Sequence, residues 1–298
     1  MTRDAFGTYH PVVTMGYFVL TIGCAMVLIH PVCQGISLAC AVMYALHLGG
    51  KKALRRNVLY MLPLLVITVL VNAAFTHQGV TILTYLPSGN PLTLESILYG
   101  LSTAFLLVTV IAWFSCFNAV MTSDKLVYLF GRILPALSLL LSMALRMVPR
   151  FGAQLKNIAD AQRCIGRDVS SGTFLQRARH GIRILSILIT WALENAMDTA
   201  DSMKARGYGL PGRTAFSVYR FRKRDRCALL FILCSAAVLF AGIVCKQLRF
   251  SYYPLLPPLL ISVWQPVLYV FYAAMCAFPL FLNRRESIKW RLQSKSKT

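Results

Sequence analysis

The chain has 298 residues, of which 57% are apolar and only 14% are charged, and its mean hydropathy is +0.61. A soluble domain carries about 25% charged residues, so this composition excludes an ordinary water-soluble fold and predicts a membrane protein embedded in a lipid bilayer. The formal net charge is +21. No nucleic-acid-binding motif accompanies that charge, so we expect no nucleic-acid partner.

Six apolar segments are predicted to be membrane spans, each of which needs about 20 residues. They cover residues 12–29, 32–48, 58–75, 97–120, 227–244 and 259–282. Loops rich in Lys and Arg stay in the cytoplasm, and the loop after the second span contains Lys51, Lys52, Arg55 and Arg56. If both termini are cytoplasmic, only Lys246 and Arg249 lie outside, which leaves 29 of the 31 basic residues inside. We therefore expect an all-α polytopic bundle of about six spans.

The chain is predicted to have three regions. Residues 1–120 hold four spans, residues 121–226 form a charged insertion, and residues 227–298 hold two spans and a basic tail. The insertion carries 18 Lys and Arg and 7 Asp and Glu. Its apolar stretch 182–193 is too short to cross a bilayer. A second stretch, 133–148, could cross only if the basic residues that follow it lay outside. The insertion is therefore predicted to be cytoplasmic or interfacial and helical.

The first long helix of the insertion places Phe151, Leu155 and Ile158 at helical spacing. Pro149 is expected to kink this helix just before Arg150, because proline removes a backbone hydrogen bond.

The second long helix places Ile189 and Leu193 on an apolar face. A separate acidic stripe consists of Glu194, Asp198 and Asp201. We expect the stripe to pair with the basic helix 150–167 and to support the crossing of the two helices. The second helix is predicted to end at Lys204-Ala205-Arg206-Gly207, because basic residues suit a helix C-terminus and glycine commonly follows it.

Catalytic and metal-binding patterns are absent from the sequence. The five histidines are scattered, and no two cysteines form a C-x-x-C pair. Residues 207–214 resemble a P-loop with Arg in place of Lys, but they follow a helix rather than a strand, so we reject that assignment. Glu95 is interpreted as an acid at a helix N-terminus. We expect no enzyme activity, no cofactor and no metal site.

A family resemblance enters at Ala205-Arg206-Gly207. The stretch 201–214 resembles the second signature of the transmembrane T component of energy-coupling factor (ECF) importers, which belong to the ABC transporters. Residues 161–168 resemble the helix that carries the family's first signature. The match there is incomplete, because Ile165 precedes Gly166 where the family has arginine, and Arg163 and Arg167 are the candidates to replace it.

The resemblance implies a four-part importer in a bacterial or archaeal cell membrane. A T component joins two cytoplasmic ABC ATPases to a membrane S component, which binds a vitamin or a metal ion. Each signature docks one ATPase, and the helices that carry the signatures act as coupling helices. The alternative is a self-contained secondary transporter or channel, although the spans contain few ionisable residues.

Overall fold

The computed structural model describes residues 4–76, 79–85, 91–133, 135–210, 219–245, 247–248, 250–252 and 264–295. It divides the chain into two compact units. The first unit consists of Met1–Thr122 and Tyr219–Thr298, and the second unit of Ser123–Val218. The predicted insertion ran to residue 226, but the structure assigns the basic run that starts at Arg220 to the first unit.

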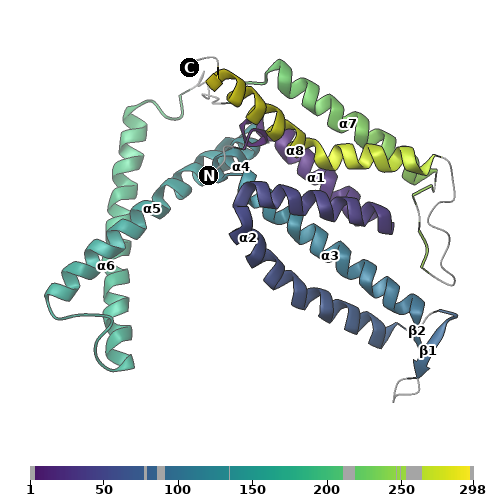
Figure 1. Cartoon of the computed structure of the whole chain (residues 1–298). Helices are drawn as coiled ribbons and strands as arrows, with labels where there is room; N and C mark the ends of the chain where they lie inside the picture. The colour runs from purple at the N-terminus through teal and green to yellow at the C-terminus, as the bar shows by residue number, and fades with distance from the viewer. Residues whose placement is uncertain are drawn as a thin grey trace. The chain divides into compact units, whose positions relative to one another are not determined.

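The first unit is a bundle of apolar helices (Figure 1). Its elements are the 3-10 helix η1 (Phe6–Thr8), α1 (Pro11–Val27), α2 (Pro31–Phe75), β1 (Ile82–Tyr85), β2 (Pro91–Thr93), α3 (Leu94–Val120), α7 (Lys223–Val244) and α8 (Gln265–Lys295). Among the described residues, four helical segments are long and apolar enough to cross a membrane: Pro31–Gly50, Leu94–Val120, Lys223–Val244 and Gln265–Lys289. Pro11–Val27 and Val58–Asn72 are shorter apolar helices. The all-α polytopic prediction is therefore confirmed.

Two predicted boundaries differ from the structure. The basic connection at 51–56 is helical, and Gly50 alone breaks α2, with φ 66° and ψ −174°. Glycine adopts this left-handed conformation without strain, and the Lys and Arg residues that follow are good helix formers. The last span was predicted to start at residue 259. Its helix begins at Gln265, and residues 259–263 lie outside the described residues.

Close helix contacts hold the first unit together. A Cβ atom on Gly100 of α3 would lie 2.9 Å from Cβ of Asn72 in α2, and one on Gly242 of α7 would lie 2.8 Å from Cδ1 of Leu268 in α8. Small residues allow membrane helices to approach closely in this way. The core also contains a fully buried Trp113, whose indole N–H donates to Ser37 Oγ at 2.9 Å.

Glu95 lies in the first turn of α3, as predicted. It is 2% exposed, and the hydroxyl of Thr81 donates to its carboxylate at 2.6 Å. Thr81 directly precedes β1, which pairs antiparallel with β2. The hairpin therefore closes the end of α3 with a polar group bound to the helix-terminal acid.

The two ends of the first unit hold different segments. At one end, the N–H of Ala5 donates to Asn283 of α8 at 2.7 Å, and Arg224 of α7 donates to the carbonyl of Thr8. At the other end, the hydroxyl oxygen of Tyr269 in α8 lies 3.0 Å from Nε2 of His30, the N-cap of α2. The starts of α1 and α7 therefore share an end with the basic part of α8. Which end faces the cytoplasm remains a prediction from the charge rule.

The second unit contains α4 (Ser123–Ile133), α5 (Pro135–Cys164) and α6 (Phe174–Ala205). The hydroxyl of Ser138 in α5 donates to the carbonyl of Val127 in α4 at 3.3 Å. Helix α5 continues through Pro149. Since α5 and α6 have 30 and 32 residues, each is roughly 45–50 Å long.

Candidate functional site

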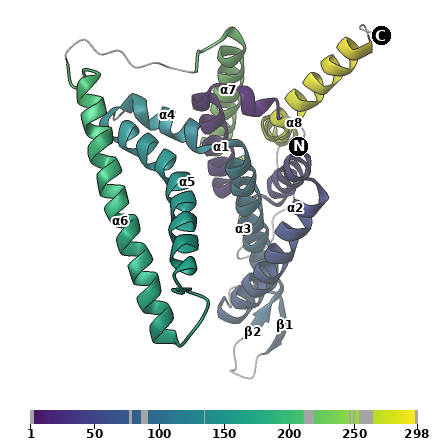
Figure 2. The same ribbon diagram turned by 90° about the vertical axis from the view of Figure 1, so that its left-hand side faces the viewer.

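Helices α5 and α6 run antiparallel and lie side by side (Figure 2). The side-chain amide of Asn195 donates to Met147 Sδ at 3.7 Å, and the rings of Phe151 and Trp191 meet edge to face at 5.9 Å. The step of four residues from Met147 to Phe151 in α5 thus corresponds to the step of four residues from Asn195 back to Trp191 in α6. A further seven-residue step in each helix reaches Ile158 and Ile184, both of which are buried. One stripe of side chains on each helix therefore forms the packed face. It consists of Met147, Phe151 and Ile158 on α5 and of Asn195, Trp191 and Ile184 on α6.

The packed face differs from the predicted one. On α6 it contains Trp191 and Asn195, whereas the predicted apolar residues Ile189 and Leu193 are 51% and 62% exposed. On α5, Leu155 is 43% exposed, and the half-buried Gln154 lies on the packed side. The larger ring of Trp191 takes the position against Phe151, and no described residue covers the aliphatic face of α6. This face also includes Ile182, Leu185 and Met197.

The end of α6 is a Schellman cap centred on the predicted signature. Ala205 is the last helical residue, Arg206 is the C-cap, and Gly207 has φ 76°. The N–H of Gly207 donates to the carbonyl of Lys204 at 2.9 Å, and the N–H of Tyr208 to that of Met203 at 3.0 Å. These two bonds define the motif, and glycine is the usual residue at its left-handed position. Residues 211–214 of the rejected P-loop lie outside the described residues.

Arg206 lies exposed at this cap. Its side chain makes no hydrogen bond or ion pair with the part of the chain that the structure describes. Tyr208 and Leu210 beside it are 45% and 66% exposed. The α6 terminus therefore presents one guanidinium together with apolar side chains.

The end of α5 has the same cap. The N–H of Gly166, which has φ 78°, donates to the carbonyl of Arg163 at 3.0 Å. The N–H of Arg167 donates to the carbonyl of Gln162 at 3.0 Å. Ile165 is consequently the C-cap, the position that Arg206 holds in α6, and it is 65% exposed.

Arg163 is paired within its own loop. Its Nε lies 3.3 Å from the Asp168 carboxylate. Hydrogen bonds from the hydroxyl and N–H of Ser170, at 2.6 and 3.0 Å, lower the pKa of Asp168, and the nearby Arg163 contributes to that shift. Arg163 is thus directed toward Asp168. Arg167 is half-buried, and its side chain has no polar partner among the described residues.

The predicted pairing of the acidic stripe with α5 is not present among the described residues. Glu194 and Asp198 are exposed and form no ion pair there, as is also the case for Arg150. Oδ1 of Asp201 lies 3.9 Å from Nζ of Lys204, which is one turn along the same helix. Aromatic and aliphatic side chains form the contact between α5 and α6 instead.

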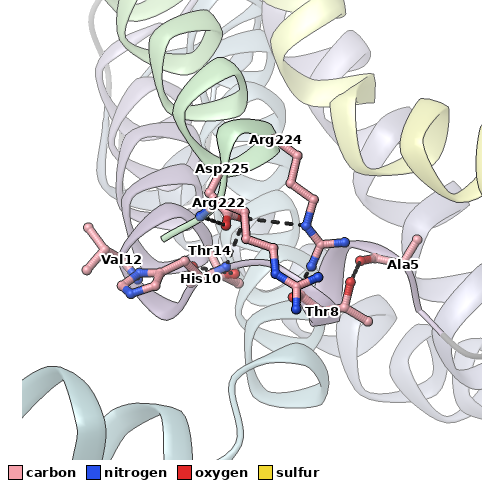
Figure 3. A network of polar contacts seen from close by, with 8 residues as sticks. All are labelled: Ala5, Thr8, His10, Val12, Thr14, Arg222, Arg224 and Asp225. Carbon is pink, nitrogen blue, oxygen red and sulfur yellow. Dashed lines mark hydrogen bonds and ion pairs between the residues drawn. The ribbon is translucent and has the colours of Figure 1, made fainter. Parts of the chain in front are cut away.

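A buried polar network fixes the chain where it leaves the second unit (Figure 3). Asp225 of α7 is 1% exposed and accepts from the N–H groups of Arg222 and His10 at 2.8 and 3.3 Å. Arg224 donates to the carbonyl of Thr8 at 2.8 Å. This network was not predicted from the sequence, although Arg222 and Asp225 have the spacing of an N-terminal capping pair.

The His10 ring extends this contact to the segment that follows residue 218. It lies edge to face against Phe221 at 4.9 Å and near Tyr219 at 6.4 Å. The start of α1 is therefore fixed to the residues that immediately follow the second unit.

Comparison of the sequence with known protein families finds a matching family model. Residues 10–216 match the family model described as cobalt transport protein (CbiQ). This range extends from the N-cap of α1 to beyond α6, and it includes both Schellman caps.

Individual relatives align over a shorter part. A protein from Listeria innocua named energy-coupling factor transporter transmembrane protein EcfT is 36% identical over 105 residues, which are 35% of this chain and 40% of the relative. Proteins of the same name from Lactobacillus helveticus and Staphylococcus aureus are 36% identical over 98 residues and 33% identical over 105. The aligned part thus spans about two fifths or less of these relatives.

Proposed function

The chain belongs to the cobalt transport protein (CbiQ) family and is a transmembrane component of the energy-coupling factor type, and from this premise we propose that it is the coupling subunit of an importer. In the proposed importer, two cytoplasmic ATPases bind the ends of α5 and α6. A membrane S component binds the substrate, a vitamin or a metal ion. The chain itself transmits movement and is not catalytic.

The Arg206 cap is the observation that supports the proposal most strongly. Its Schellman geometry places a guanidinium at the end of a helix of 32 residues. The planar group has five donors suited to carboxylates and carbonyl oxygens. An exposed arginine without a partner in the described chain, held by a fixed cap, is well placed to enter a groove on another protein.

The uncovered apolar faces support a second contact. Ile182, Leu193 and Met197 of α6 are between 62% and 68% exposed, and Leu140 and Val148 of α5 are similarly exposed. Large exposed apolar surfaces mark sites of protein–protein or membrane contact. We assign these faces to the S component, which is itself a membrane protein. A rotation of the S component would then follow a movement of α5 and α6.

Coupling in this proposal is mechanical. When the ATPases close on ATP, the helix ends they hold move together with the packed stripe between Phe151 and Trp191. Packed helices transmit such a displacement because their interfaces do not deform continuously. The segment fixed by Asp225 carries the movement on to the start of α1.

The test is recovery of the ATPases with affinity-tagged variants of Arg206, measured together with ATP-dependent uptake. Removing one member of a buried charge pair costs about 2–5 kcal/mol. Arg206→Glu should therefore abolish ATPase recovery, and Arg206→Ala should weaken it. Arg206→Lys should retain only part of the wild-type recovery, because an ammonium lacks the bidentate fork.

Lys204→Glu is the matched control, since it makes the same charge reversal two residues away on a side chain that is 79% exposed. It should have little effect. Wild-type ATPase recovery with Arg206→Glu would refute the proposed docking role.

A further inference from the structure

A pocket of about 520 Å³ opens in the first unit, where α2 and α3 begin. Its wall is mostly apolar. Leu38 of α2 and Leu101 and Phe105 of α3 line it, together with Phe250 from the segment that follows α7. Small-molecule sites in proteins usually measure about 300–1,000 Å³ and combine such walls with a few polar groups. The pocket therefore has the size and the lining of a ligand site.

Three polar side chains that line this pocket form a chain of hydrogen bonds. The hydroxyl of Tyr252 donates to Ser102 Oγ at 2.8 Å, and its contact with the carbonyl of Ile29 is longer, at 3.4 Å. The Ser102 hydroxyl donates to Gln34 Oε1 at 2.9 Å. A hydroxyl has only one proton, so Ser102 accepts from Tyr252 and gives its own proton to Gln34. The chain therefore ends at the amide nitrogen of Gln34.

This amide nitrogen lacks an acceptor. Gln34 is 5% exposed, and its Nε2 has no hydrogen-bond partner among the described residues. Leaving an amide donor unsatisfied away from water is unfavourable, and most buried polar groups in proteins are paired. Gln34 itself lines the pocket. A molecule that fills the pocket can therefore bring an acceptor to this amide.

The amide lies close to the end of a membrane span. The span Pro31–Gly50 begins three residues before Gln34, which corresponds to roughly 5 Å of helix. Tyrosine is enriched at the two membrane–water interfaces, and Tyr252 belongs to the same hydrogen-bonded chain. The open amide is therefore near the boundary between lipid headgroups and acyl chains. The ester carbonyls of a phospholipid lie at this boundary.

A lipid supplies the missing acceptor more readily than the helix of a partner protein does. The backbone carbonyls of a membrane helix are already bonded within that helix. The ester carbonyls of a phospholipid are free to accept, and the attached acyl chains match an apolar wall. We propose that this pocket binds one acyl chain of a phospholipid, whose ester carbonyl accepts a hydrogen bond from Gln34. The inference concerns the first unit alone and does not depend on the proposed coupling function.

Native mass spectrometry of the purified full-length chain tests the polar half of the proposal. The delipidated chain is titrated with palmitoyl-oleoyl phosphatidylglycerol and with its dialkyl ether analogue, which has the same headgroup but no ester carbonyl. The wild-type chain should bind the ester lipid about tenfold more tightly, as expected for one hydrogen bond. Gln34→Leu should remove this preference, because leucine has a similar size and no donor. Ser102 can then donate to a carbonyl of its own helix, so the variant should fold.

Filling the pocket tests the apolar half. Gly35 lines the pocket, and a Cβ atom there would meet no atom within 4 Å apart from its chain neighbours and its own helix backbone. Gly35→Phe should therefore lower the affinity for the ester lipid by about tenfold or more, since a ring in the pocket excludes the acyl chain. Replacement of a helical glycine favours the helix, so the melting temperature should not fall.

Gly23→Phe is the matched control. Gly23 lies in α1, has equally open space around its Cβ position, and lines a second apolar pocket of about 480 Å³ between α1 and α7. The polar side chains Gln34, Ser102 and Tyr252 do not line that second pocket. The affinity of Gly23→Phe for the ester lipid should stay within about twofold of wild type, because the proposed site is unchanged.

Three results would overturn the inference. Equal affinity of the wild-type chain for the ester and ether lipids would show that no ester carbonyl is recognised. An ester preference that survives in Gln34→Leu would assign recognition to another residue. Unchanged ester-lipid affinity in Gly35→Phe would place the lipid outside this pocket. In that last case, a loss of the S component from the purified complex with Gly35→Phe would identify a protein as the occupant.

Discussion

Asp225 provides the most quantitative prediction. Its carboxylate is 1% exposed and accepts two backbone hydrogen bonds, from Arg222 at 2.8 Å and from His10 at 3.3 Å. Asp225→Ala removes the acceptor for both donors at the point where α7 begins and α1 begins. The perturbation therefore affects two helix starts that are more than 200 positions apart in sequence.

The expected cost follows from these contacts. Leaving a buried donor unsatisfied costs about 1–3 kcal/mol, and the longer bond to His10 belongs at the low end of that range. The ion pair with Arg224, at 3.9 Å with Arg224 40% exposed, adds less than about 1 kcal/mol. The total is about 3 kcal/mol, which corresponds to about a 100-fold change in the local opening equilibrium. Asp225→Asn keeps one acceptor and should lose about half as much.

Hydrogen exchange of the purified chain in lipid nanodiscs measures this change. Backbone amides of the first turns of α1 and α7 should exchange about 100-fold faster in Asp225→Ala, whereas amides at the centre of α3 should not change. Asp201→Ala is the control, because its side chain is 80% exposed and its contact is a surface pair at 3.9 Å. Equal protection of α1 and α7 in the wild type and Asp225→Ala would refute the proposed role of the carboxylate.

Two further predictions concern topology and the acidic stripe. In a cysteine-free background, an impermeant thiol reagent added outside the cell should label a cysteine at Thr84 in the hairpin but not one at Arg177 in α6; labelling at Arg177 would rule out a cytoplasmic second unit. The triple variant Glu194→Gln, Asp198→Asn, Asp201→Asn should leave the α5–α6 distance unchanged in spin-label measurements, because these carboxylates form no described pair with α5. Phe151→Ala should lengthen that distance. A change with the triple variant alone would show that charge pairing holds the two helices together.

Much of the first unit could be predicted from the sequence. Apolar length and the distribution of basic residues identified six segments that correspond to the six apolar helices found among the described residues. The break in α2 was predicted less well. A positive φ at a single Gly50 turns the chain without a loop, and composition alone does not distinguish this from a longer connection.

The second unit shows where sequence periodicity is insufficient. Ile189 and Leu193 are more hydrophobic than Asn195, yet Asn195 lies on the packed face. The choice depends on which ring fits against Phe151, and this is a property of both helices together. The C-terminal cap at Arg206 was predictable because its signal is local: a basic residue followed by glycine. The equivalence of Ile165 with Arg206 required the hydrogen bonds of both caps.

Under the proposed function, the matched caps separate docking chemistry from coupling mechanics. In a Schellman cap the backbone bonds run from the glycine and the residue after it to carbonyls in the last turn, so the cap side chain takes no part in them. Ile165 and Arg206 can therefore differ completely while both helix ends keep the same backbone conformation. A change at either cap should alter which partner surface binds without altering the packed stripe around Phe151 and Trp191. Under the proposed docking role, specificity for a partner can then change one side chain at a time, while the two packed helices remain the same.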